Sequence, residues 1–230
     1  MRTLATAVLL AALTLAPAAP ARAPRYQRLP EVVLFDDLPI YSGPSTSARY
    51  VGRLHADRPL TGEQTHVPLL GTSGTKHSAW YHVRLPGRPN SWTGWIPARD
   101  TEIGYTVWHL EVSTSRRQLR VYRAGKLVKT LLVVVGKPST PTPHGQFFIE
   151  EVVSVPRNGV GAPYALATSA RSNVLQEYAG GPGQIALHGT NNIGGVPGTA
   201  VSHGCIRVPT RGILWLAHHI GPGVTLTIRG

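Results

Sequence analysis

The chain has 230 residues, a formal net charge of +12, 25 Gly and 20 Pro. This length allows one large domain or two modest ones, and the many Gly and Pro residues argue against long helices and favour an all-β fold. The positive charge favours an anionic partner, but the Lys and Arg residues are scattered and no nucleic-acid-binding motif occurs, so no nucleic-acid partner is predicted.

The first 23 residues are typical of a secretory signal peptide. Arg2 precedes an uncharged apolar stretch from Leu4 to Leu15, and small residues and prolines follow. The stretch is short for a membrane span, although an uncleaved anchor is the alternative. Cleavage after Ala18 is favoured over cleavage after Ala23, because Pro24 directly follows the second site. The sequence therefore predicts an exported, extracytoplasmic protein.

An Arg/Pro-rich linker at residues 24–30 precedes a region of short strands at 31–100. Runs such as Trp80 to Leu85 alternate in polarity and end at turn residues, which favours a small barrel. The motifs at 38–44, 80–83 and 94–97 resemble a bacterial SH3-like domain. In such domains aromatic residues can line a ligand groove, but core packing is the favoured role here for Trp80, Trp92 and Trp95.

Longer strands are predicted from residue 105 to residue 230. They are expected at Thr106–Val112, Gln118–Arg123, Lys126–Val135, Gln146–Val155, Gln184–Leu187 and Thr225–Ile228. The second and third form a hairpin around Ala124 and Gly125, and the apolar run Leu131–Val135 is expected to be buried on both faces. One helix is predicted after Pro209, ending at Gly221. The region is thus mainly β, with one short C-terminal helix, and is expected to fold alone from about residue 102.

Cys205 is the single cysteine. An exported chain with one cysteine cannot form an internal disulfide, and an idle free thiol is a liability in an oxidising compartment. A reactive role is therefore favoured over the alternative, a buried and inert cysteine that packs as a small apolar residue.

Two polar clusters flank a Gly/Asn/Pro-rich loop near the C-terminus: His188-Gly189-Thr190 and Ser202-His203-Gly204-Cys205-Ile206-Arg207. The pattern predicts a thiol activated by an imidazole whose other nitrogen is oriented by a third group. No carboxylate lies near His188 in the sequence, so the Gly189 carbonyl is the candidate orienting group. The amides of Gly204 and Cys205 are candidates for an oxyanion site, and Arg207 for binding a substrate carboxylate.

Either histidine is a candidate for the base. His203 lies only two residues before Cys205, so only a sharp turn at Gly204 would bring its ring to the sulfur. His188 comes from a separate strand and can approach across the sheet. His188 is therefore the predicted base.

The intact S-H-G-C-I-R motif, together with H-G-T, resembles the L,D-transpeptidase family with the YkuD-type catalytic domain. The segment from Gly136 to Phe147 and the strand Tyr164–Ser169 also resemble family motifs. The resemblance implies a β-sandwich-like catalytic domain at 105–230 that acts without a cofactor. It implies that Cys205 attacks the bond before the terminal D-Ala of a peptidoglycan stem peptide, and that an acceptor amine resolves the thioester into a 3→3 cross-link.

By position, the resemblance implies that Cys205 is the nucleophile, His188 the base and Gly189 its orienting partner, with His203 and Gly204 around the oxyanion site. It implies substrate-binding or supporting roles for the residues Arg207, Ser202, Thr190 and Tyr164. It also implies cell-wall association and inhibition by carbapenem-type β-lactams. An acidic residue that family members often carry shortly after the Arg is absent from 209–212.

Three alternatives stay open. A zinc site built from His188, His203 and Cys205 lacks a clear fourth ligand. An L,D-carboxypeptidase would hydrolyse the same acyl-enzyme and release a tripeptide. A catalytically silent protein would only bind the cell wall through its SH3-like domain.

Overall fold

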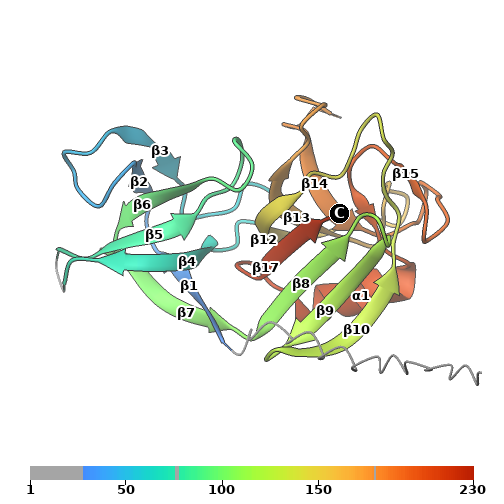
Figure 1. Cartoon of the computed structure of the whole chain (residues 1–230), viewed down its shortest axis with the longest axis horizontal. Coiled ribbons are helices and arrows are strands. Elements are labelled where there is room, and N and C mark those ends of the chain that lie inside the picture. The colour runs from blue at the N-terminus through green and yellow to red at the C-terminus, as the bar shows by residue number, and fades with distance from the viewer. Residues whose placement is uncertain (1–27, 76–77, 179) are drawn as a thin grey trace, which may run out of the picture.

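The computed structural model describes residues 28–75, 78–178 and 180–230. These residues form two β-sheet bodies that lie side by side, with a helix packed on the second body (Figure 1). The predicted signal peptide at 1–23 and most of the linker at 24–30 fall outside the described residues. Within the described ranges, no helix is long and apolar enough to cross a membrane.

The N-terminal sheet contains seven antiparallel strands in the order β3-β2-β6-β5-β4-β1-β7. The strands are β1 (Leu29–Leu34), β2 (Leu38–Tyr41), β3 (Tyr50–Leu54), β4 (His66–Ser73), β5 (Trp80–Arg84), β6 (Thr93–Pro97) and β7 (Thr101–Thr106). Alternate side chains of the strands, among them Val32, Leu34 and Val83, fill a small core. The predicted β architecture is confirmed, whereas the SH3-like identity of this body stays a prediction.

The C-terminal body is an eight-stranded mixed sheet in the order β10-β9-β8-β17-β12-β13-β14-β16, with a small two-stranded sheet of β11 and β15. Its elements are β8 (Trp108–Ser113), β9 (Gln118–Arg123), β10 (Lys126–Leu132), β11 (Val135–Gly136), β12 (Gly145–Ser154), β13 (Tyr164–Arg171), β14 (Gln184–His188), β15 (Ala200–Ser202), β16 (Ile206–Arg207), α1 (Thr210–His219) and β17 (Thr225–Arg229). A mainly β chain with one short C-terminal helix is confirmed for the described residues.

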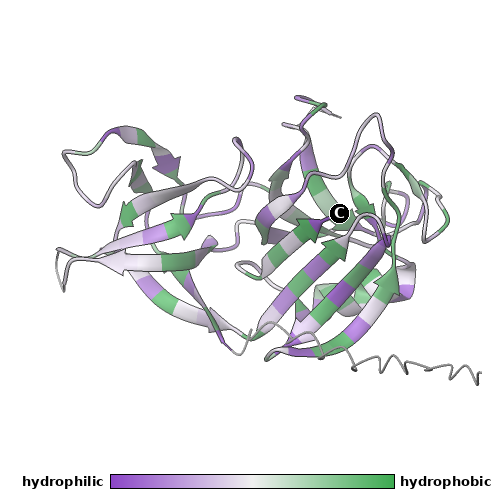
Figure 2. Ribbon diagram, in the orientation of Figure 1, coloured by the Kyte–Doolittle hydropathy of each residue, from purple (hydrophilic) through white to green (hydrophobic). Residues whose placement is uncertain are grey.

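The hairpin predicted around Ala124 and Gly125 is confirmed. Both residues have positive φ angles, 47° and 78°, as a tight two-residue turn between twisted strands requires. Hydrophobic and hydrophilic residues alternate along β8 and β9 (Figure 2). The prediction that Leu131–Val135 forms one strand buried on both faces is wrong, because β10 ends at Leu132, whose side chain is 51% exposed. β10 is the edge strand of its sheet, and every side chain from Lys126 to Leu132 is exposed or half-buried.

Helix α1 begins directly after Pro209, as predicted. The fixed φ of proline suits the residue before a helix, and Ile220 closes the other end by donating its N–H to the Leu216 carbonyl. Gly212, Ile213 and Leu216 form its buried face. Because Gly212 packs against Val208 and Leu131, the helix holds the chain that leaves β16 against the body.

Strand β12 belongs to both cores. Phe147 and Ile149 point into the C-terminal core, whereas Phe148 is fully buried in the N-terminal core. Beyond it a bulge interrupts the pairing with β13, and two successive carboxylates face the N-terminal body. Glu150 forms ion pairs with Arg58 and Arg171, and Glu151 accepts hydrogen bonds from Thr61. The two bodies are therefore joined by a packed and charged interface.

Candidate active site

Strands β14 and β16 run parallel and bring the two predicted reactive residues to one face. Leu187 pairs with Ile206, and both side chains are fully buried in the core. His188 pairs with Arg207 in the next register position, on the opposite face. Cys205 lies two positions before Arg207, so it shares the face of His188. Both residues border one pocket of about 110 Å³.

A single backbone carbonyl fixes the His188 ring. Its Nδ1 lies 2.8 Å from the Gly189 oxygen, and because a carbonyl only accepts, Nδ1 must carry the proton. Burial lowers the pKa of His188, the Gly189 hydrogen bond partly opposes this, and the positive charge of Arg207 lowers the pKa further. The ring is therefore neutral at neutral pH, with the lone pair on Nε2.

Gly161 supports this ring from behind. A Cβ atom at position 161 would lie 2.5 Å from His188 Nδ1, and the φ of 82° also favours glycine. The Gly161 carbonyl accepts the Gly189 N–H at 2.7 Å, so one glycine fixes both the ring and the residue that orients it. Sequence reasoning missed Gly161, whose only signal is its place in a glycine-containing loop.

The Cys205 thiol is protonated at neutral pH. Burial raises the pKa of Cys205, while the Ala186 N–H and the positive charge of Arg207 act in the opposite direction. The sulfur lies 3.9 Å from the Gln184 carbonyl oxygen, a distance at which the S–H is a weak donor. A proton acceptor is therefore needed to generate the thiolate.

A tight turn at 202–204 presents Cys205. Ser202 Oγ donates to the Cys205 carbonyl at 2.6 Å and accepts the Gly204 N–H at 3.1 Å, and Gly204 has a φ of 122°. Ser202 thus holds the turn, and the Gly204 N–H is already used. The Cys205 N–H has no hydrogen-bond partner within the described part of the chain. Of the two predicted oxyanion donors, only the Cys205 N–H is free.

Two threonines that sequence reasoning missed anchor the same turn. Thr142 Oγ1 donates to the Gly204 carbonyl at 2.8 Å, and Thr140 Oγ1 donates to the Ser202 carbonyl at 3.2 Å. Both belong to the Pro-rich segment at 136–143, which was singled out only for its resemblance to a family motif. Their signal is the Thr-Pro spacing of that segment.

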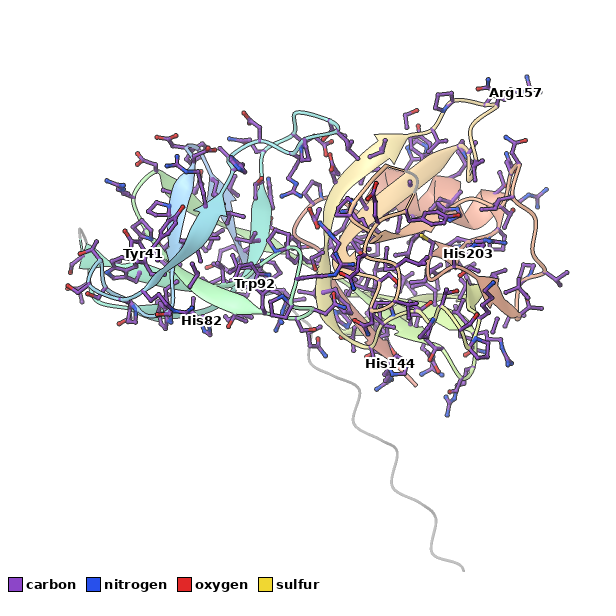
Figure 3. All side chains as sticks on the ribbon, turned by 90° about the horizontal axis from the view of Figure 1, so that it is seen from above. Tyr41, His82, Trp92, His144, Arg157 and His203 are labelled. Atoms are coloured by element: carbon purple, nitrogen blue, oxygen red, sulfur yellow. The ribbon has the colours of Figure 1, made fainter. Side chains whose placement is uncertain are left out.

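His203, labelled in Figure 3, is exposed and lines the same two pockets as Cys205. Its ring stacks on Tyr178, with centroids 5.7 Å apart and planes inclined by 29°. It borders the pocket of His188 and also a smaller pocket of about 20 Å³ lined by Leu175, Tyr178 and Cys205. His203 therefore forms a wall between two pockets that meet at Cys205.

Arg207 is buried, with 7% of its surface exposed, and borders the larger pocket. Its Nη1 donates to the Gly194 carbonyl at 3.3 Å. Its buried Nε has no hydrogen-bond partner among the residues described. An unpaired buried donor is costly, so this guanidinium is suited to receive an external acceptor.

Two of the four predicted substrate-binding residues lie outside the pockets. The Tyr164 ring is edge-on to His218 of α1, with centroids 6.3 Å apart. The Thr190 carbonyl accepts the Gly194 N–H and shapes the following loop. Neither residue borders either pocket at Cys205, whereas Ser202 and Arg207 do. Within the described ranges, no group of three or more His, Cys, Asp or Glu residues is placed to hold a metal ion.

Comparison with known proteins shows the family to which the C-terminal body belongs. Residues 108–228 match the YkuD domain, described as the L,D-transpeptidase catalytic domain. The YkuD protein of Bacillus licheniformis is 36% identical over 158 residues, which cover 69% of this chain and 80% of that protein. The YkuD protein of Bacillus subtilis is 32% identical over 151 residues, covering 66% and 76%.

Among solved structures, an L,D-transpeptidase from Mycobacterium smegmatis aligns with a TM-score of 0.43 and 19% identity, covering 70% of this chain and 82% of that one. L,D-transpeptidase 3 from Mycobacterium tuberculosis, solved with a faropenem-derived adduct, aligns with a TM-score of 0.44 and 13% identity, covering 66% and 91%. The family domain matches more than half of the chain, and the matches to the two Bacillus proteins cover most of the length of those proteins. The chain therefore belongs to the L,D-transpeptidase family of the YkuD type.

Proposed function

We propose that this protein is a peptidoglycan L,D-transpeptidase that forms 3→3 cross-links through a thioester on Cys205. One observation carries the proposal: His188, oriented by the Gly189 carbonyl and kept neutral by burial, shares a pocket and a sheet face with the thiol. A neutral imidazole with one nitrogen fixed is suited to take a proton at the other.

In the first half-reaction, His188 Nε2 takes the Cys205 proton while the sulfur attacks the carbonyl carbon between the third stem residue and D-Ala. The Cys205 N–H stabilises the negative oxygen of the tetrahedral intermediate. The intermediate collapses, the C–N bond breaks, and His188 returns the proton to the leaving D-Ala amine. A thioester between the stem and Cys205 remains.

Arg207 is proposed to bind the donor substrate. Its buried Nε lacks a partner among the described residues, and the guanidinium borders the pocket that contains Cys205. The D-Ala carboxylate is planar and can accept two parallel hydrogen bonds from the N–H groups of a guanidinium. His203, stacked on Tyr178, is proposed to shape the two pockets that meet at Cys205, next to the site of the oxyanion.

In the second half-reaction, the side-chain amine of an acceptor stem attacks the thioester carbonyl. His188 takes a proton from this amine, the C–S bond breaks and the thiol is restored. Water in place of the amine would give hydrolysis and a tripeptide product. Because the acyl-enzyme is common to both, the two activities differ only in what reaches the thioester.

The proposed setting is the cell wall. We propose an exported protein with an SH3-like, wall-binding domain at 31–100 and a catalytic domain at 105–230. Its net charge of +12 is suited to an anionic wall. Family membership supports carbapenem-type β-lactams as inhibitors that acylate the same thiol.

The proposal is tested by intact-mass spectrometry and product analysis. Wild-type protein incubated with a tetrapeptide muropeptide is expected to carry an acyl adduct and to release dimers, while the Cys205→Ala variant gives neither. An adduct of equal yield on Cys205→Ala would exclude this nucleophile. Tripeptide without dimer would show a carboxypeptidase, and unchanged muropeptide with retained sacculus binding would show a wall-binding protein.

A further inference from the structure

Residues 172–178 and 180–183, called the wall segment here, form one wall of the smaller pocket at Cys205. Ser172, Leu175, Tyr178 and Gly183 all line that pocket. The base of the segment is closed by the Ser172 N–H, which donates to the Gly183 carbonyl at 2.7 Å. Its first turn is held by Ser172 Oγ, which accepts the N–H groups of Val174 and Leu175. The far side of this wall faces the N-terminal body.

Arg88 of the N-terminal body binds three carbonyls of this segment. Its Nη2 donates to Ser172 at 2.8 Å and to Leu175 at 3.2 Å, and its Nη1 donates to Pro182 at 2.9 Å. One guanidinium thus links the beginning, the middle and the end of the wall. The rigid fork of arginine can reach separate acceptors in this way, whereas the compact lysine ammonium cannot reproduce it.

Asn90 binds the residues where the segment leaves β13. Its Nδ2 donates to the Arg171 carbonyl at 2.7 Å and to Asn173 Oδ1 at 2.8 Å. Its Oδ1 accepts the Arg171 N–H at 2.8 Å. The Asn90 side-chain amide therefore forms all three of these hydrogen bonds in a single orientation, with Nδ2 as donor and Oδ1 as acceptor.

The loop that carries Arg88 and Asn90 is itself fixed. Trp92 donates its indole N–H to the Pro86 carbonyl at 2.8 Å and packs on the N-terminal core. Figure 3 shows Trp92 on the side of this body that faces the C-terminal body. Ser91 Oγ accepts the Gln146 N–H of β12 at 2.8 Å. The loop is therefore fixed on the N-terminal body and holds the pocket wall of the C-terminal body in place.

We propose that Arg88 and Asn90 are positioning residues of the active site: through the wall segment, the N-terminal body sets the pocket that holds the stem peptide beside Cys205. The inference rests on the proposed function and adds a second role to the N-terminal body. It acts on substrate placement and leaves the thiol and its base untouched, because neither residue contacts Cys205 or His188.

The test compares Arg88→Ala, Arg88→Lys and Asn90→Asp with a control, Arg99→Ala. Arg99 is an exposed arginine of the same body, and its one ion pair within the described part of the chain is with its neighbour Asp100. The variants at 88 and 90 are expected to raise KM for a tetrapeptide muropeptide about fivefold or more, with kcat within about twofold. Arg88→Lys should recover only part of the loss. Alkylation of Cys205 by iodoacetamide should match wild type in every variant.

Amide hydrogen exchange gives a readout that does not depend on turnover. The N–H groups of Val174 and Leu175 are expected to exchange about tenfold faster in Arg88→Ala and at the wild-type rate in Arg99→Ala. Unchanged exchange and unchanged KM overturn the inference. If wild type forms no acyl adduct while the exchange still rises, the proposed function fails and the positioning of the wall stands.

Discussion

At Cys205 and His188, burial acts on both groups and keeps both neutral. It raises the pKa of the thiol and lowers the pKa of the imidazole. The pair is therefore at rest as thiol and imidazole, and in the proposed mechanism the proton moves only when substrate is attacked. This differs from a cysteine that is already a thiolate beside a charged histidine.

A pH dependence follows from these directions. Acylation needs the neutral form of His188, whose pKa lies below the usual histidine range. The rate should stay near its plateau as the pH falls through that range and should drop only at more acidic pH. Because the pKa of Cys205 is raised, its alkylation by iodoacetamide should titrate above an ordinary thiol. An alkylation rate that has already reached its high-pH plateau at neutral pH would contradict a resting thiol.

The two histidines are expected to differ in effect. His188→Gln removes the proton acceptor, so acylation by a stem peptide should slow by about 10²–10⁴-fold. His203→Gln leaves the acceptor in place and removes a ring from the pocket wall, so it should mainly raise KM. Stopped-flow acylation with a chromogenic carbapenem measures both variants. A larger loss of rate in His203→Gln would show that the base is misassigned.

Gly161→Ala should displace the His188 ring. The added Cβ would lie 2.5 Å from Nδ1, and the backbone there favours glycine. Acylation should fall by about tenfold or more, since small misplacements of a catalytic group are costly. Gly198→Ala is the matched control, because Gly198 also has a positive φ, 92°, but nothing lies within 4 Å of a Cβ there. Equal losses in both variants would attribute the effect to backbone strain alone.

At the scale of elements, the sequence predicts strands and hairpins well where polarity alternates. The hairpin of β9 and β10 and the helix after Pro209 are present as expected. Strands β15 and β16 have two or three residues and are defined only by their pairing partners, so no local pattern reveals them. The sequence does not predict β7 (Thr101–Thr106), because its polar residues and Gly104 give no alternation of apolar and polar residues. Its strand conformation is stabilised by pairing with β1.

The candidate active site likewise contains residues that a local sequence pattern predicts and residues whose role depends on distant contacts. The motif residues Cys205, His188 and Arg207 could be identified because reactive side chains are recognisable in the sequence. Thr142, Gly161 and Arg88 could not, because each acts through the backbone of a distant segment. Such contacts exist only once the chain has folded.

At the scale of the whole molecule, the interface at β12 argues against a C-terminal body that folds alone from residue 102. Such a fragment would expose Phe148 and remove Arg58 and Thr61 from the two buried carboxylates. Moving a buried aromatic ring into water costs free energy, and Glu150 would keep only Arg171 as a partner. The two bodies are therefore expected to unfold together.

Phe148→Ala measures this coupling. Truncating a fully buried phenylalanine costs about 3–5 kcal/mol of unfolding free energy. Phe35→Ala is the control, because Phe35 is 55% exposed and its loss should change little. Urea titration followed by tryptophan fluorescence should show a single transition, shifted to lower urea only for Phe148→Ala. Separate transitions for the two bodies in wild type would contradict the coupling.

Consecutive residues of β12 enter different cores, which has a consequence for protein engineering and for the ways in which such chains can diversify. An N-terminal module cannot be exchanged here as if it were a tag on a linker. Any graft must offer a recess for Phe148, a cation for Glu150 and hydrogen-bond donors for Glu151. Chimaeras that keep the linker but ignore these three requirements should be recovered as aggregates, whereas those that restore them should be recovered as soluble protein.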